Sequence, residues 1–171
     1  SHTYSGGATD FLSVNNVGAQ NAVLKITAGA HGFYDMPIAE AASSRGAVYQ
    51  SGGTLTLNRA GSVSTMRLGS GANSYGYYRL SGGALSTAEI GIGADASANT
   101  VGVMDISGGT FNDSGWVTLG RGTTTSSGIL NMTGGSMALS GAVGGSKIAL
   151  NFAGTAGAQS VMSVSNATVT G

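Results

Sequence analysis

Few side chains in this sequence could act as catalytic acids, bases or nucleophiles. The 171 residues include two histidines, seven acidic residues and no cysteine. His31 stands four residues before Asp35, but no nucleophile lies near them as a triad requires, so a solvated loop histidine is favoured. Asp105 and Asp113 share one repeat and come nearest to the carboxylate pair of a glycosidase. We therefore predict no enzyme, with a polysaccharide lyase or hydrolase as the weakest alternative.

The glycines do not form a metal-binding or nucleotide-binding motif. Residues 91–95 match part of the Gly-Gly-x-Gly-x-Asp calcium repeat, but Asp95 has no equivalent in the other repeats. A phosphate-binding loop would need a lysine in register and a helix after the glycines, and neither is present. The sequence predicts no cofactor and no metal.

Three aromatic residues are the best candidates for a binding role. Tyr49, Tyr77 and Trp116 occupy positions that alternate with apolar ones, so their rings are expected to face outward. Exposed rings on a flat β-sheet face stack on sugars or pack against a partner subunit. Trp116 is the strongest single candidate, and a ring that merely covers the neighbouring repeat is the alternative.

The composition limits the classes of partner. Charged residues make up only 8% of the chain, with seven basic and seven acidic side chains, so the basic surface that nucleic acids require is missing. The sequence contains no run of about 18 apolar residues, so no membrane-spanning helix is expected. Surfaces with so little charge tend to associate.

A repeated motif dominates the chain. Segments 76–83, 102–109 and 128–135 each run from a glycine through a short apolar stretch to Ser/Thr-Gly-Gly, and they are 26 residues apart. Related copies occupy 46–53 and 160–167. A fixed period of this length indicates stacked structural repeats.

Apolar and polar residues alternate within each motif, which indicates strands. The position two residues before the first glycine is occupied by Gln50, Leu80, Ile106, Met132 and Val164. The position three residues after it is occupied by Leu55, Leu85, Phe111, Met137 and Val169. We expect these columns to face inward and to stack, and the intervening column with Tyr49, Arg79, Asp105, Asn131 and Ser163 to face outward.

The first glycine of each pair is expected to form a corner between two strands. This position holds Gly52, Gly82, Gly108 and Gly134, and then Asn166 in the last copy. Because Gly and Asn tolerate positive φ better than other residues, we predict a left-handed backbone at Asn166. A second motif ends in Gly69, Gly93, Gly120 and Asn151, and the same exchange occurs there.

These observations predict an all-β fold, a single right-handed parallel β-helix with about six or seven rungs of about 23–32 residues each. One domain is expected over residues 1–171, with regular repeats over 46–171 and irregular or degenerate rungs over 1–45. Residues 33–45 contain the only proline and are predicted to leave the regular body, with one helical turn after Pro37.

Segment 51–57 (Ser-Gly-Gly-Thr-Leu-Thr-Leu), together with 107–111 and 81–85, resembles the passenger-associated and autotransporter-associated β-strand repeats of bacterial surface proteins. The resemblance covers residues 46–171 well and 1–45 poorly. It implies secretion and display outside the cell, as a surface stalk, adhesin or fibre-forming subunit. A carbohydrate-binding module that uses the outward aromatic residues is the alternative function.

The expected partners follow from the ends of a β-helix. First and last rungs leave backbone N–H and C=O groups unpaired unless a cap covers them, and no capping helix is predicted at either end. We therefore expect self-association end to end, or continuation of the rungs by a longer chain. Surface glycans are the other candidate partner.

Overall fold

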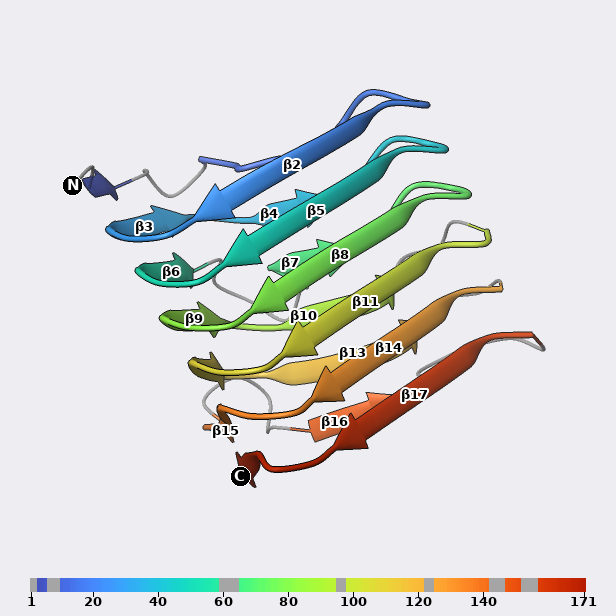
Figure 1. The fold of residues 1–171 in the computed structure, drawn as a ribbon. Helices are drawn as coiled ribbons and strands as arrows, with labels where there is room; N and C mark the ends of the chain where they lie inside the picture. The colour runs from blue at the N-terminus through green and yellow to red at the C-terminus, as the bar shows by residue number, and fades with distance from the viewer. Residues whose placement is uncertain are drawn as a thin grey trace.

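The computed structural model describes residues 10–58, 65–94, 98–121, 125–141, 147–151 and 157–171, together with the backbone of 3–5. Every element in these ranges is a β-strand or a turn, and none is a helix. The described strands pair in parallel throughout and stack as a β-helix, which confirms the predicted fold class (Figure 1).

Three sheets form the walls of the β-helix (Figure 1). The front sheet contains β2 (Asn21–Ile26), β5 (Arg45–Gln50), β8 (Tyr75–Leu80), β11 (Val101–Ile106), β14 (Ser127–Met132) and β17 (Gln159–Val164). The side sheet contains β1 (Thr3–Ser5), β3 (Ala30–Phe33), β6 (Thr54–Leu57), β9 (Ala84–Thr87), β12 (Thr110–Asp113), β15 (Ser136–Leu139) and β18 (Thr168–Thr170). The back sheet contains β4 (Met36–Ile38), β7 (Met66–Leu68), β10 (Ile90–Ala94), β13 (Trp116–Arg121) and β16 (Lys147–Leu150).

Each rung visits the front, side and back sheets in that order before the chain moves down to the next rung. The front strands run toward the side sheet and the back strands run away from it, so the winding is right-handed (Figure 1). This agrees with the handedness expected for parallel crossover connections. The described strands number six in the front sheet, seven in the side sheet and five in the back sheet, so the complete rungs are slightly fewer than the predicted six or seven.

The core consists of apolar side chains stacked rung on rung. Ile106 pairs with Leu80 on one side and Met132 on the other, and all three side chains are fully buried. The predicted inward column is therefore confirmed. Gln50 also points inward, where its Nε2 donates to the Ala84 carbonyl at 3.0 Å and its Oε1 accepts a hydrogen bond from the buried Tyr78 hydroxyl. These bonds satisfy the one amide that interrupts the column.

The corners show which residue of each pair adopts the left-handed backbone. The predicted positive φ is confirmed at Asn166, and Asn151 also has it, each at 51°. In the glycine pairs, however, the left-handed residue is the second glycine, at Gly53, Gly83, Gly109 and Gly135. The sequence prediction assigned that role to Gly52, Gly82, Gly108 and Gly134, which lie in the corner turns but do not have positive φ.

The first glycine is required for a different reason. A Cβ atom at Gly82 would lie 2.6 Å from the Ser51 carbonyl oxygen of the previous rung, and the same clash arises at Gly108 and Gly134. The rungs can therefore approach at this corner only where the side chain is absent. In the last corner Asn166 itself turns left-handed, so this corner differs from the others.

The predicted excursion at residues 33–45 is wrong. Met36–Ile38 form β4, which pairs in register with β7, and all three residues are fully buried or nearly so. Pro37 fits because β4 is the last regular strand of the back sheet, where a residue without an N–H is tolerated. The chain then turns through Ala39 and Ser43, which have φ of 60° and 57°, and no helical turn forms.

Candidate functional site

The outward face of the front sheet carries two parallel stripes of side chains that run along the rod. The apolar stripe consists of Val23, Ala47, Tyr77, Val103, Ile129 and Val161. The polar stripe lies two residues further along each strand and consists of Lys25, Tyr49, Arg79, Asp105, Asn131 and Ser163. Hydroxyl-bearing residues follow the strands at Ser51, Ser81, Ser107, Thr133 and Ser165. Strict register places equivalent residues on successive rungs about 4.8 Å apart.

A hollow of about 360 Å³ opens in this face between the two stripes and the hydroxyl residues. Its lining comes from β8, β11, β14, β17 and the residues that follow β11 and β14, namely Tyr77, Arg79, Asp105, Ser107, Asn131, Thr133 and Ser163. The hollow forms because the polar stripe changes from long side chains on β8 to a serine on β17. Nearly every lining group can donate or accept a hydrogen bond.

Asp105 occupies the centre of the hollow and links three rungs. Its Oδ2 accepts a hydrogen bond from the Tyr77 hydroxyl at 2.7 Å, and its Oδ1 accepts one from Asn131 Nδ2 at 2.9 Å. Burial and then this hydrogen bond to Asp105 raise the pKa of the Tyr77 phenol, so Tyr77 stays a neutral donor. These two hydrogen bonds fix how the three side chains are oriented relative to one another.

Two of the three predicted aromatic candidates lie together at this site. The Tyr49 and Tyr77 rings have centroids 5.6 Å apart at an angle of 58°, and Tyr49 is 40% exposed. Tyr75, on the same face, is 39% exposed. Tyr77 lines the hollow and Tyr49 packs against it from β5, so these two rings form an aromatic border at the β5–β8 side of the hollow.

Trp116 lies on a different sheet from the two tyrosines. It begins β13 in the back sheet, is half-buried, and pairs with Lys147 of the next rung. The Lys147 ammonium lies 3.7 Å from the centroid of the indole ring, a cation–π contact between rungs. This placement matches the alternative reading in which the ring packs against its neighbouring repeat.

The residues considered for catalysis are dispersed. The His31 ring Nε2 lies 3.0 Å from the Ala28 carbonyl oxygen, whereas Asp35 is buried and forms an ion pair with Arg67, Nη1 to Oδ2 3.4 Å. Asp105 is on the front sheet and Asp113 is at the end of a side-sheet strand, so they do not form a carboxylate pair.

Asp113 is instead part of a buried polar pair in an otherwise apolar column. Thr87 Oγ1 donates to Asp113 Oδ2, and the Gly115 amide donates to Oδ1 at 2.8 Å. Burial raises the pKa of the Asp113 carboxyl to about 6, and the nearby Glu89 charge adds to the rise. Asp113 and Thr87 also line a second hollow, of about 390 Å³, at the side sheet.

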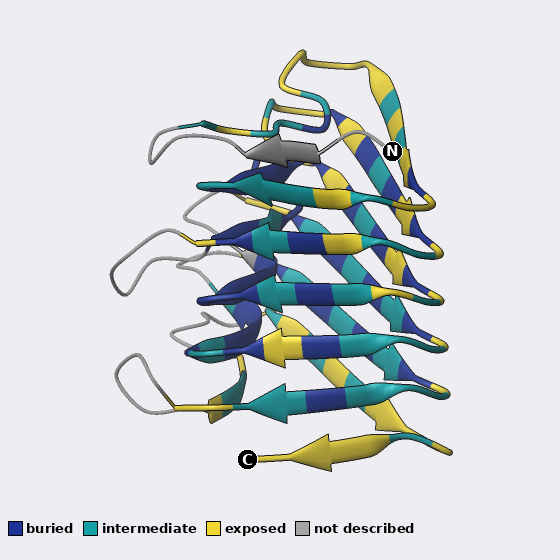
Figure 2. Cartoon of the chain, turned by 90° about the vertical axis from the view of Figure 1, so that its left-hand side faces the viewer, coloured by how far each residue is buried: buried dark blue, intermediate teal, exposed yellow. Residues whose placement is uncertain are grey.

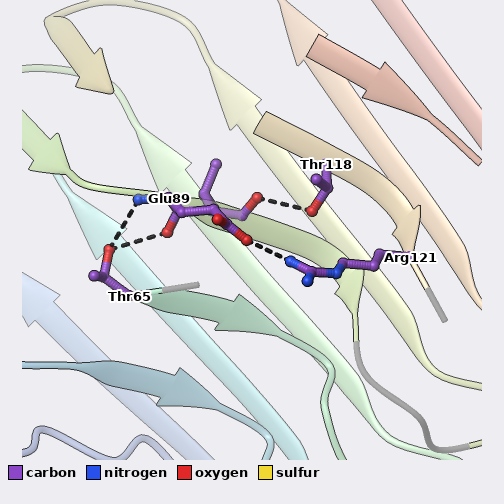
Figure 3. Close-up of polar contacts among 5 residues, drawn as sticks. Thr65, Glu89, Thr118 and Arg121 are labelled. Atoms are coloured by element: carbon purple, nitrogen blue, oxygen red, sulfur yellow. Dashed lines mark hydrogen bonds and ion pairs between the residues drawn. The ribbon is translucent and has the colours of Figure 1, made fainter. Parts of the chain in front are cut away.

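A partly buried group of polar and charged side chains lies at the back sheet (Figure 3). Glu89, only 4% exposed, forms an ion pair with Arg121. Thr65 Oγ1 donates to the Glu89 carbonyl at 2.9 Å, and Thr118 Oγ1 donates to the Ile90 carbonyl at 3.1 Å. Sequence reasoning missed this group because Thr65 and Glu89 lie outside the strands and Gly120, with its positive φ, interrupts the alternation before Arg121.

Among the described residues, no group of three or more His, Asp and Glu side chains is arranged to hold a metal ion. No helix in the part of the chain that the structure describes is long and apolar enough to cross a membrane. Comparisons with protein-family models, with characterised proteins and with solved structures gave no match. The functional inferences therefore rest on the sequence pattern and on the contacts given above.

Proposed function

We propose that the chain is a structural segment of an extracellular β-helical rod, of the kind that bacteria display as a surface stalk, adhesin or fibre. The support comes from the regular stack of parallel rungs around a continuous apolar core. The extracellular assignment draws on the resemblance of segment 51–57 to repeats of bacterial surface proteins. No catalysis is part of the proposal: Asp35 and Glu89 are held in ion pairs with arginines, and Asp105 and Asp113 lie on different sheets.

The open C-terminal end exposes side chains from columns that are buried elsewhere. Leu150, Val164 and Val169 are 53%, 45% and 38% exposed. Their partners one rung earlier, Leu119, Met132 and Met137, are fully buried at 0%. Figure 2 shows the change, with the strand at the C label exposed along its length below rungs of alternating burial. Further rungs of the same protein, or another copy of the chain, would cover this apolar face.

The backbone of the last rung is also available for pairing. Within the described residues, β16, β17 and β18 are each the last strand of a sheet, so one edge of each strand has no partner. Regular strands with open edges accept further strands unless charge, a bulge or a cap prevents it. The residues of β17 carry no charge, so the edge has no electrostatic protection.

Further rungs of a longer protein would cover this end, and the opposite end of a second copy is the other partner that fits it. At the N-terminal end, β2 is the last strand of the front sheet, and its inward side chains Ala22 and Leu24 are only half-buried. Because all strands of the sheet are parallel, a copy translated along the axis can add its β2 to β17 in the same register. Such a contact is heterologous and repeats without closing, which produces a filament.

Analytical ultracentrifugation and negative-stain electron microscopy of the purified chain test this proposal. We expect concentration-dependent association and short rods extended along one axis. Val164→Lys and Val169→Lys should abolish association, because they place a charge in the apolar end face. Val161→Lys is the matched control, since Val161 is on the same strand and 52% exposed but faces outward. A monomer at all concentrations, or equal disruption by the control, would contradict the proposal.

A further inference from the structure

We propose that the hollow on the front sheet is a binding site for a linear, uncharged polysaccharide that lies along the rod axis over β8, β11 and β14. The site combines a cavity, a fixed hydrogen-bonding network and an aromatic border on one flat face. This site is distinct from the end faces that the proposed filament uses, so each proposal can be tested independently of the other.

The repeat of the face favours a ligand that is itself a repeating chain. Asp105 and Asn131 are equivalent residues on successive rungs, as are Ser107 and Thr133. Their spacing along the axis is about 4.8 Å, the separation of neighbouring strands. A sugar ring is of similar length, so a chain of sugars lying along the axis presents one ring to each rung.

The chemistry of the lining favours hydroxyl groups. A sugar hydroxyl both donates and accepts, and the hollow offers a carboxylate acceptor at Asp105, an amide at Asn131 and hydroxyls at Ser107, Thr133 and Ser163. Hydrogen bonds to a charged group are the stronger kind, and Asp105 is half-buried within reach of the hollow.

The charge balance favours a neutral ligand. Arg79 and Asp105 are the only formally charged residues that line the hollow, and their charges cancel. An anionic polysaccharide or a nucleic acid would bring many negative charges to a face that supplies one arginine beside one carboxylate.

The apolar stripe supplies the surface against which the C–H face of a sugar can pack. The Tyr77 ring borders the hollow and is held by its hydrogen bond to Asp105 and by the Tyr49 ring. Val103 and Ile129 continue the stripe beside Asp105 and Asn131. The C–H face of a sugar packs against such a surface, and a side chain that is already fixed loses little conformational freedom on binding.

NMR titration of the ¹⁵N-labelled full chain with cellohexaose, mannohexaose and xylohexaose tests the proposal, with a galacturonic acid hexamer as the anionic comparison. We expect saturable shifts of backbone amides in 77–79, 103–107 and 129–133 with at least one neutral sugar, and unshifted amides in 116–121. The anionic hexamer should bind more weakly than that sugar.

Variants at the site separate recognition from folding. Tyr77→Ala and Asn131→Ala should each lower the association constant by about tenfold or more, because they remove the ring contact and one hydrogen-bonding group. Tyr77→Phe keeps the ring and should retain most of the affinity. That result would show that Tyr77→Ala weakens binding by removing the ring and not by misfolding. Asn112→Ala is the matched control, since Asn112 is an exposed asparagine on the side sheet.

Three results would overturn the proposal. The first is no saturable binding of any of the three neutral hexasaccharides at millimolar concentration. The second is tighter binding of the galacturonic acid hexamer, or shifts confined to another face. The third is front-face shifts that depend on protein concentration and not on sugar, which would assign this face to contact between copies.

Discussion

At the scale of single residues, the corners and the buried polar groups carry the most information. The exchange of glycine for asparagine correctly predicted positive φ at Asn166, but not that the second glycine is the left-handed one in the other corners. A sequence column shows which residues are interchangeable at a position. It does not distinguish a glycine needed for its backbone angle from one needed for close approach, as at Gly82.

Asp113 gives a residue-scale prediction about pH. Its folded pKa of about 6 is above the ordinary value of 3.8 for an aspartate, so the folded state binds the proton more tightly than the unfolded chain. The free energy of unfolding therefore falls as pH rises from about 4 to about 6 and stays lower above that range. Asp113→Asn removes the buried charge while it keeps the shape and an acceptor for the Gly115 amide.

We expect Asp113→Asn to raise the free energy of unfolding by about 1–3 kcal/mol at pH 7.5 and to change it little at pH 4. Urea unfolding at the two pH values measures the difference, and the pH 4 value is the internal control. An equal effect at both pH values, or destabilisation at pH 7.5, would show that ionisation of Asp113 does not lower the free energy of unfolding.

At the scale of elements, the front and side strands were largely predictable from the sequence, whereas the fold of residues 33–45 was not. Alternation with period two located the front and side strands and their inward columns, because one face of each strand lies against the core. Residues 33–45 were misread, since a proline is a breaker inside a sheet but acceptable in β4 at its edge.

The candidate site was only partly predictable from the sequence. Tyr49 and Tyr77 were identified as outward aromatics, and their proximity follows from register. Trp116 is on another sheet, and the sequence pattern alone does not show which sheets carry which outward rings. The ion pair of buried Glu89 with the partly exposed Arg121 was not predicted, because Gly120 with its positive φ interrupts the alternation just before Arg121.

The strand β11 allows a direct test of the two faces at the element scale. Ile106 is fully buried between Leu80 and Met132, whereas Val103 on the same strand faces outward. Ile106→Asp should abolish cooperative folding, because it places an unpaired charge in a narrow apolar core. Val103→Asp should leave a cooperative thermal transition, and circular dichroism melting distinguishes the two. Cooperative melting of Ile106→Asp near the parent temperature would mean that this column faces solvent.

At the scale of the whole molecule, the two ends differ from the middle of the rod. The interior rungs are covered above and below, and their inward side chains are fully buried, whereas the last rung exposes Leu150, Val164 and Val169. At the other end, residues 11–14 lie over the back sheet, with bridges from Phe11 to Asp35 and from Val14 to Ile38. Among the described residues β2 is the last strand of the front sheet, and β17 of another copy can pair with it.

Disulfide cross-linking tests the end-to-end contact most directly, because the chain has no cysteine of its own. Lys25 and Ser163 lie in the same outward stripe, on β2 and β17. If β2 of one copy adds to β17 of another in register, their Cα atoms are about 4.8 Å apart, which suits a disulfide. We expect the double variant Lys25→Cys with Ser163→Cys to form a ladder of covalent oligomers on a non-reducing gel after mild oxidation. The pair Lys25→Cys with Val161→Cys is two residues out of register and should form far fewer covalent oligomers. Equal ladders from the two pairs, or no ladder from either pair, would contradict the filament.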